Sequence, residues 1–168
     1  MKFKQEINLS EIHPKVEKLS FEKLNWKLCQ SSEAEMTKEE CTLAEKEYRR
    51  FLTLKLLHPK VSFVPNKLVD KYWHAHILDT KSYHQDCISL FGGYLHHFPY
   101  FGIYGDDDAE NLKDSFEETK KIYEKTFGTY PQDLNNASRC EDHACHAPSS
   151  CACRVEGACK DDGIQLSA

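Results

Sequence analysis

Apolar residues recur at the spacing of α-helices along most of the chain up to position 130, and the strict alternation typical of β-strands is nearly absent. The periodicity is loose over residues 10–28, where Pro14 stands at a position that the first turn of a helix tolerates. Thr37 and Glu40 form the sequence pattern of a capping box, in which each side chain satisfies a backbone N–H of the other residue. The apolar residues that follow predict a long helix that ends at His58-Pro59.

Two shorter helices are predicted next, because residues that start and stop helices occur in the expected order. Asn66 is a suitable N-cap for a helix over residues 67–79. Thr80 is a suitable N-cap for a second helix that continues to Phe91, where two consecutive glycines end it.

The rest of the body contains one loop and one helix. Residues 94–105 combine aromatic side chains with proline and glycine, a composition that predicts an ordered loop. Three aspartates from Asp106 onward place negative charge at the positive end of a last helix, which extends to about Phe127. The pattern therefore predicts an all-α fold, a small bundle of about five helices with an aromatic loop that carries histidines.

The composition changes after Tyr130. Residues 131–168 are rich in Asn, Ser, Ala, Asp and Cys and contain almost no large apolar side chains. Such a segment cannot bury enough surface to offset the entropy lost on ordering. We therefore expect two parts, a helical histidine-rich domain over residues 1–130 and a flexible cysteine-rich tail over residues 131–168 that metal or disulfides would organise.

Length, charge and the N-terminal sequence narrow the class of protein. A chain of 168 residues is long enough for one domain with a core, and its net charge of −5 is spread without the basic face that nucleic acid requires. Residues 1–10 lack the apolar core of a secretory signal, and no apolar run approaches the ~20 residues that span a bilayer. We expect a cytoplasmic protein with neither a nucleic-acid nor a membrane partner.

Histidines concentrate in the thirty residues from Asp70 to Pro99. Five of the nine histidines of the chain fall there, together with several aspartates. Imidazole is the commonest metal ligand and the side chain whose ordinary pKa lies nearest neutrality, so this density points to a metal site or to proton chemistry. The five are His74, His76, His84, His96 and His97.

A helical projection separates the first two of these histidines. At 100° per residue, His74 and His76 lie roughly 160° apart, so one regular helix cannot present both to a single ion. Asp70 and His74, four residues apart, share a face and can share a site.

The glycines after Phe91 permit a chain reversal that brings a loop back to the helix. We expect the principal site to join His74 or His76 to one or both of His96 and His97, with Asp70 as a ligand or as a support for the ligands. In this arrangement His84 is dispensable. Ligation by imidazole and carboxylate suits a transition metal ion rather than Mg²⁺ or Ca²⁺, with zinc first and copper or iron next.

The run V-D-K-Y-W-H-A-H-I-L-D-T-K-S-Y-H-Q-D-C-I-S-L-F-G-G-Y-L-H-H-F-P-Y-F-G over residues 69–102 resembles the glycine-rich-domain-containing-protein-like family. The resemblance extends over about residues 35–130. It rests on the W-H-x-H and L-H-H-F-P elements, which occur at the separation expected for the family. With only seven glycines the chain lacks the region that names the family. The resemblance implies a helical module that contains a site and names no reaction. It covers Asp70, Trp73, His74, His76, Asp79, Thr80, Tyr83, Cys87, Phe91, Gly92, His96, His97 and Pro99.

The tail has chemistry of its own. Five thiols and two imidazoles fall within twenty residues, in spacings that match neither a zinc ribbon nor an iron–sulfur motif. In a reducing compartment such a cluster binds metal or handles redox more often than it forms structural disulfides. The candidate residues are Cys140, Cys145, Cys151, Cys153, Cys159, His143 and His146.

Three functions remain open at this stage. The first is a protein that binds a transition metal, either as an enzyme with hydrolytic or oxidative chemistry at the histidine cluster or as a carrier. The second is a metal-free protein-interaction module whose histidines are structural. The third is an enzyme or metal carrier that acts with or on its own cysteine-rich tail, so the partner is a small molecule, a peptide or that tail.

Overall fold

The structure is a computed structural model that describes residues 12–134 and 160–166. The elements run in the order α1 (Pro14–Glu17), α2 (Glu22–Cys29), α3 (Lys38–Leu57), α4 (Lys67–Leu78), α5 (Thr80–Phe91), β1 (Gly93–Phe98), α6 (Asp106–Phe127), the single 3-10 turn η1 (Gln132–Leu134) and β2 (Lys160–Leu166). Helices dominate the described residues, which confirms the all-α class.

The N-terminal region forms two short helices where the sequence suggested one helical stretch over residues 10–28. The Arg49 side chain, which projects from α3, donates hydrogen bonds to the carbonyls of Val16 and Leu19. These bonds hold the chain in a turn between α1 and α2. A loose apolar pattern could not reveal this interruption, because its cause is a side chain thirty residues away.

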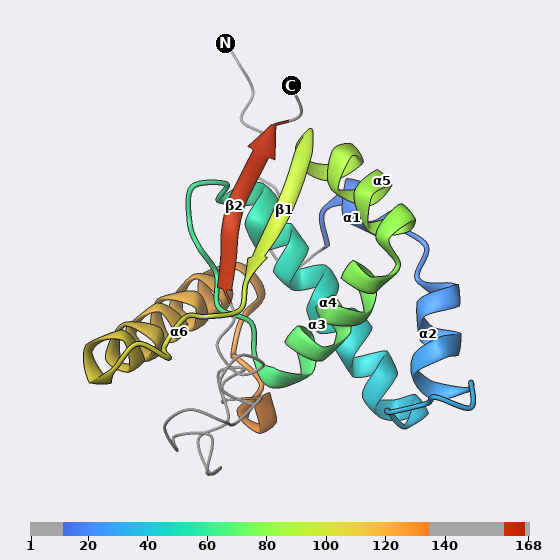
Figure 1. Cartoon of the computed structure of the whole chain (residues 1–168), viewed down its shortest axis with the longest axis horizontal. Coiled ribbons are helices and arrows are strands. Elements are labelled where there is room, and N and C mark those ends of the chain that lie inside the picture. Colours follow the sequence, from blue (N-terminus) through green and yellow to red (C-terminus); the bar gives the residue numbers. More distant parts are fainter. Residues whose placement is uncertain (1–11, 135–159, 167–168) are drawn as a thin grey trace.

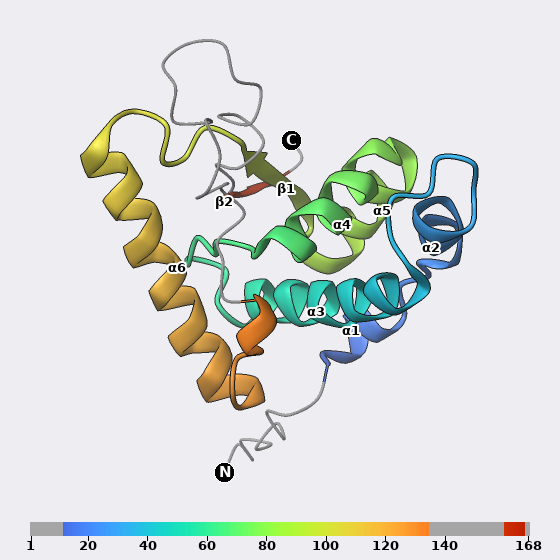
Figure 2. The ribbon, with the colours of Figure 1, turned by 90° about the horizontal axis from the view of Figure 1, so that it is seen from below.

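Helix α3 is the central element and contacts α1, α2, α4 and α6. Its predicted capping box is present: the Glu40 N–H donates to Thr37 Oγ1 at 3.1 Å, and the Thr37 N–H donates to Glu40 Oε2 at 2.8 Å. The helix ends at Leu57, before Pro59, as predicted. Figure 2 shows α3 crossing the body, with α4 and α5 on one side and α6 at one end.

Helix α4 begins as the sequence predicts, and α5 differs by one residue. Asn66 Oδ1 accepts from the Val69 N–H, and the Asn66 amide donates to the Tyr130 hydroxyl at 2.8 Å, which fixes the start of α4. The N-cap of α5 is Asp79 rather than Thr80, because the Asp79 carboxylate accepts from the Ser82 N–H. Gly92 adopts a φ of +70° and ends α5.

The segment after α5 corrects the loop prediction, because residues 93–98 form strand β1. This strand pairs antiparallel with β2, from Gly93 opposite Leu166 to Phe98 opposite Lys160, with an irregularity between Leu95 and His97. Figure 1 shows the two strands side by side next to α4 and α5. The end of the predicted tail therefore belongs to the body. Composition does not reveal such a strand, because backbone hydrogen bonds to β1 hold it in place and these do not depend on the side chains. One apolar residue of the strand, Ile164, packs against the core.

Helix α6 packs against α3 through a buried polar contact. The Tyr123 hydroxyl donates to the Glu47 carboxylate at 2.8 Å, and Arg50 also donates to Glu47 at 3.0 Å. Thr119 accepts from the Val64 N–H at 3.0 Å, just before α4. These contacts tie α6 to the segment that positions α4.

None of the helices in the described part of the chain has the length and apolar character needed to cross a bilayer.

Removal of β2 should loosen β1 and leave the helices intact. A chain that ends at residue 159 loses the ladder partner of residues 93–98, so their amide hydrogens should exchange at least about tenfold faster. Helicity measured by circular dichroism should stay close to that of the full chain. A chain that ends at Leu166 is the matched control, and equal protection of residues 93–98 in both truncated chains would contradict the pairing.

Candidate metal site

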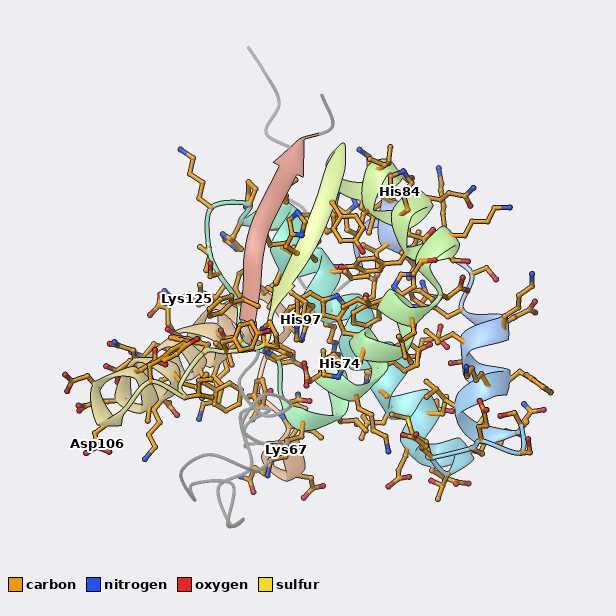
Figure 3. All side chains as sticks on the ribbon, viewed as in Figure 1. Lys67, His74, His84, His97, Asp106 and Lys125 are labelled. Carbon is orange, nitrogen blue, oxygen red and sulfur yellow. The ribbon has the colours of Figure 1, made fainter. Side chains whose placement is uncertain are left out.

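Three potential ligands converge where α4 meets β1. Asp70 Oδ1 lies 3.1 Å from His97 Nε2 and 3.5 Å from His74 Nε2, and the two imidazole nitrogens lie 2.9 Å apart. All three atoms lie within 4.8 Å of one another, and we refer to Asp70, His74 and His97 as the His/Asp cluster. Figure 3 shows His74 and His97 pointing toward one another between α4 and β1.

The sequence brings these residues together in two steps. Asp70 and His74 are four residues apart on α4 and therefore share a face, as predicted. The left-handed Gly92 then reverses the chain, and β1 runs back beside α5 and carries His97 to them. The predicted union of His74 with one histidine of the following segment is present in this geometry.

Buried aromatic side chains hold His97 in place. The His97 ring lies against the Trp73 ring with centroids 4.6 Å apart. The Trp73 Nε1–H donates to the Tyr83 hydroxyl at 3.0 Å, and this hydroxyl donates to the Leu95 carbonyl of β1. Burial raises the pKa of the Tyr83 phenol far above its ordinary value, so the phenol keeps the proton that it donates.

The His/Asp cluster is buried on two sides and open on the third. The side chains of Asp70 and His97 are only 6% and 10% exposed, whereas that of His74 is 37% exposed. Asp70 lies in the first turn of α4, where the helix dipole stabilises negative charge. Access from solvent is therefore on the His74 side.

A groove between α2 and α4 leads to this open side. It has a volume of about 1430 Å³, and Asp70 and His74 are among its lining residues. Leu24 and Leu28 of α2 line the opposite wall, so much of the surface is apolar. We refer to it as the α2/α4 groove.

The His/Asp cluster brings three polar atoms to one point. His97 Nε2 is within hydrogen-bonding distance of both Asp70 Oδ1 and His74 Nε2. A neutral imidazole carries at most one proton on that nitrogen. That nitrogen therefore either donates one proton toward both neighbours, or accepts from His74 and faces Asp70 without a proton. A cation at the common point can take one lone pair from each of the three atoms.

His76 is not part of the His/Asp cluster. Its Nδ1 lies 2.9 Å from the Tyr48 hydroxyl, and its Nε2 lies 2.9 Å from Asp86 Oδ2. Burial raises the pKa of Tyr48 well above its ordinary value, so the hydroxyl keeps a proton that it can donate to Nδ1. In that tautomer Nε2–H donates to Asp86. The expectation that His76 could take the place of His74 in the site is therefore corrected. The reason is that His76 lies on the opposite side of α4 from His74, as the helical projection indicates.

His96 and His84 also lie apart from the His/Asp cluster. His96 is not among the residues whose ligand atoms converge with those of Asp70, and it falls at the irregularity of the ladder between Leu95 and His97. Its ring lies 4.9 Å from that of Tyr94. The inclusion of His96 as a ligand is therefore corrected. His84 is exposed on α5, far from His74 in Figure 3, in line with its predicted dispensability.

Sequence reasoning missed the residues that orient the site. Trp73 and Tyr83 enter the sequence analysis only through the family resemblance, and no local pattern shows that their polar atoms form a chain to β1. The contact between His76 and Asp86 was also missed, because two residues ten positions apart on different helices give no sequence signal. The tail candidates Cys140, Cys145, Cys151, Cys153, Cys159, His143 and His146 lie outside the described residues.

Loss of the Tyr83 hydroxyl should disturb His97 specifically. Tyr83→Phe leaves the Trp73 N–H without its acceptor in the core and should cost about 1–3 kcal/mol of unfolding free energy. Tyr48→Phe removes another buried hydroxyl, should cost a similar amount, and contacts His76 instead. We expect the NMR signals of the His97 ring to shift in Tyr83→Phe and to stay in place in Tyr48→Phe. Equal shifts in both variants would argue against a selective role of Tyr83.

Comparison with known proteins adds a family and no activity. A model of the UCP032817-like family matches residues 13–123, from the N-cap of α1 into α6, and this region contains the whole His/Asp cluster. No curated protein and no solved structure matches the chain. The similarity to the glycine-rich-domain-containing-protein-like family stays a prediction. Because the match covers more than half of the 168 residues, the chain belongs to the UCP032817-like family.

Proposed function

We propose that this protein binds one transition metal ion through Asp70 Oδ1, His74 Nε2 and His97 Nε2. The observation that carries the proposal is the convergence of these three lone-pair atoms, with separations of 2.9, 3.1 and 3.5 Å. Zinc is the first candidate, followed by copper or iron, because imidazole suits these metals and Mg²⁺ and Ca²⁺ prefer oxygen ligands.

The spacing of the three atoms fits the ion. Ligands bound to zinc at ~2.0–2.1 Å in a tetrahedron are ~3.3–3.4 Å apart. The three observed separations lie on both sides of this value, so an ion can occupy the site after side-chain shifts of a few tenths of an ångström. Neither helix nor strand needs to move.

The donor set and its exposure favour a reactive site over a closed structural one. Structural zinc sites use four protein ligands, whereas catalytic sites use three and leave a position for water or substrate. The His/Asp cluster offers three ligands and is open at His74, which is 37% exposed. Two imidazoles and one carboxylate occur both in zinc hydrolases and in iron oxygenases, so hydrolytic and oxidative chemistry both fit.

Buried neighbours would keep the ligands in their binding form. Trp73 covers the His97 ring, and the Tyr83 chain fixes the strand that carries it. A ligand on a rigid element loses little conformational freedom when the ion binds. This support favours metal binding over the metal-free interaction module, for which the position of the three atoms has no role.

The proposal predicts one metal ion per chain, independent of the tail. We would use the full chain with Cys→Ser at positions 140, 145, 151, 153 and 159, so that thiols in the tail cannot bind the metal. Titration with Zn²⁺ should show one tight site and a rise in melting temperature, because the ion binds only the folded state. His74→Gln and His97→Gln should each weaken zinc binding by more than about 100-fold, the upper range for loss of an outer-shell contact.

His84→Gln is the matched control, since it removes an exposed imidazole of the same segment. Its affinity for zinc should equal that of the parent. If the parent binds less than a tenth of an equivalent of zinc, copper or iron, or if His74→Gln and His97→Gln bind as the parent does, the metal site is excluded. A change of stability alone in these two variants would instead favour the metal-free interaction module.

The tail alternative has a test of its own. If the five tail thiols form an independent metal site, the natural chain should bind more than one equivalent of zinc. Cys→Ser at the same five positions should remove the excess and leave the equivalent that depends on His74. If the serine substitutions abolished all zinc binding, the thiols and the His/Asp cluster would have to act on one ion.

A further inference from the structure

The α2/α4 groove has a chemical polarity that follows the axis of α4. Five residues of α4 share one face of the helix and line the groove together: Lys67, Lys71, His74, Ala75 and Leu78. A cationic end at Lys67 is thus followed by the His/Asp cluster and then by an apolar end at Leu78. Figure 3 places Lys67 at the end of α4 that lies below His74.

The apolar end is exposed to a degree that is unusual for its residue types. Leu78 is 78% exposed and Trp26 of α2 is 57% exposed, and both line the groove beside the buried Leu24 and Leu28. Contiguous exposed apolar surface of this kind marks binding sites more often than it occurs by chance. It begins one helical turn after His74, about 6 Å along the axis.

Five acidic residues line the groove: Asp70 belongs to the His/Asp cluster, Glu22 lies on α2, and the other three have partners. Glu33 pairs with Lys27 at 3.5 Å and Glu35 pairs with Lys71 at 3.4 Å. The Asp79 carboxylate caps α5. With a divalent ion on the His/Asp cluster, the region between Lys67 and His74 is therefore positively charged, and it suits an anion.

We propose that the α2/α4 groove binds a small apolar molecule with a terminal carboxylate. The carboxylate binds the metal ion at the open position beside His74, and the apolar part lies over Ala75, Leu78 and Trp26. This inference rests on the proposed metal site and adds the class of ligand that the site receives. The shared chemistry covers both a fatty acid and the C-terminal residues of an apolar peptide.

The two ends of the groove discriminate against other ligands. An amine of equal length would place a cation between the metal ion and Lys67, and a neutral alcohol would lose the bond to the metal. A short polar acid would leave the apolar end exposed. Only a molecule with both properties satisfies both ends of the groove.

The test uses the zinc-loaded full chain with Cys→Ser at positions 140, 145, 151, 153 and 159, titrated by calorimetry. Decanoate should bind, decanol should bind at least about tenfold more weakly, and removal of zinc should weaken decanoate by a similar factor. N-acetyl-leucyl-phenylalanine with a free or an amidated C-terminus forms the second arm, which tells a peptide source from a fatty acid. Trp26 fluorescence should shift to the blue as the ligand covers this ring.

Leu78→Asn tests the apolar end. Leu78 is exposed, so the variant should fold and keep its zinc, while decanoate affinity falls about fivefold or more. Leu43→Asn is the matched control, because Leu43 is 37% exposed on α3 and is not among the residues that line the groove. It should bind decanoate as the parent does.

The possible outcomes separate this inference from the metal proposal. If zinc binds and neither carboxylate binds more tightly than decanol or the amidated peptide, the ligand class is wrong and the metal site stands. If Leu78→Asn and Leu43→Asn have equal effects, the groove is not the binding site. If zinc does not bind, both proposals fall.

Discussion

The hydrogen bond from the Tyr83 hydroxyl to the Leu95 carbonyl fixes the distance between α5 and β1, and the candidate site depends on that distance. Tyr83 is 1% exposed and also accepts from Trp73 of α4, so one phenol joins three consecutive elements. A small rotation of β1 about this point would carry His97 away from Asp70. The hydrogen bond itself adds only modestly to stability. Its loss would cost more than it adds, because a buried polar group would be left without a partner, and it would also release the strand that carries His97.

Two histidines of the same helix show how burial decides what an imidazole can do. His76 is 3% exposed and both of its ring nitrogens have a partner in the core, in Tyr48 and Asp86. His74 points to the groove and meets two other bases at one point. The first arrangement uses the donor and acceptor capacity of the ring within the core, whereas the second brings three ligand atoms to a common centre that solvent can reach. His76 is therefore a structural residue, and His74 belongs to the candidate site.

Local sequence rules accounted for most helix boundaries and for two of the three residues of the His/Asp cluster. The capping box at Thr37, the Asn66 cap and the Gly92 stop each depend on a few adjacent residues, and these boundaries are confirmed. The pairing of Asp70 with His74 follows from helical spacing alone. The choice between His96 and His97 required knowledge of a strand, and the strand becomes visible only through its partner at residues 160–166. The turn between α1 and α2 likewise depends on Arg49, which no local window contains.

The pairing of β1 with β2 also makes the site depend on a distant part of the chain. Gly93 pairs with Leu166 and Phe98 with Lys160, so both pairs join positions more than sixty residues apart in the sequence. Pairing over such a separation is slow, because the intervening chain loses entropy when the loop closes. Asp70 and His74 share one helix face through local spacing alone, whereas the strand that carries His97 is framed only when residues 160–166 reach it. The frame around the site is therefore expected to assemble late in folding.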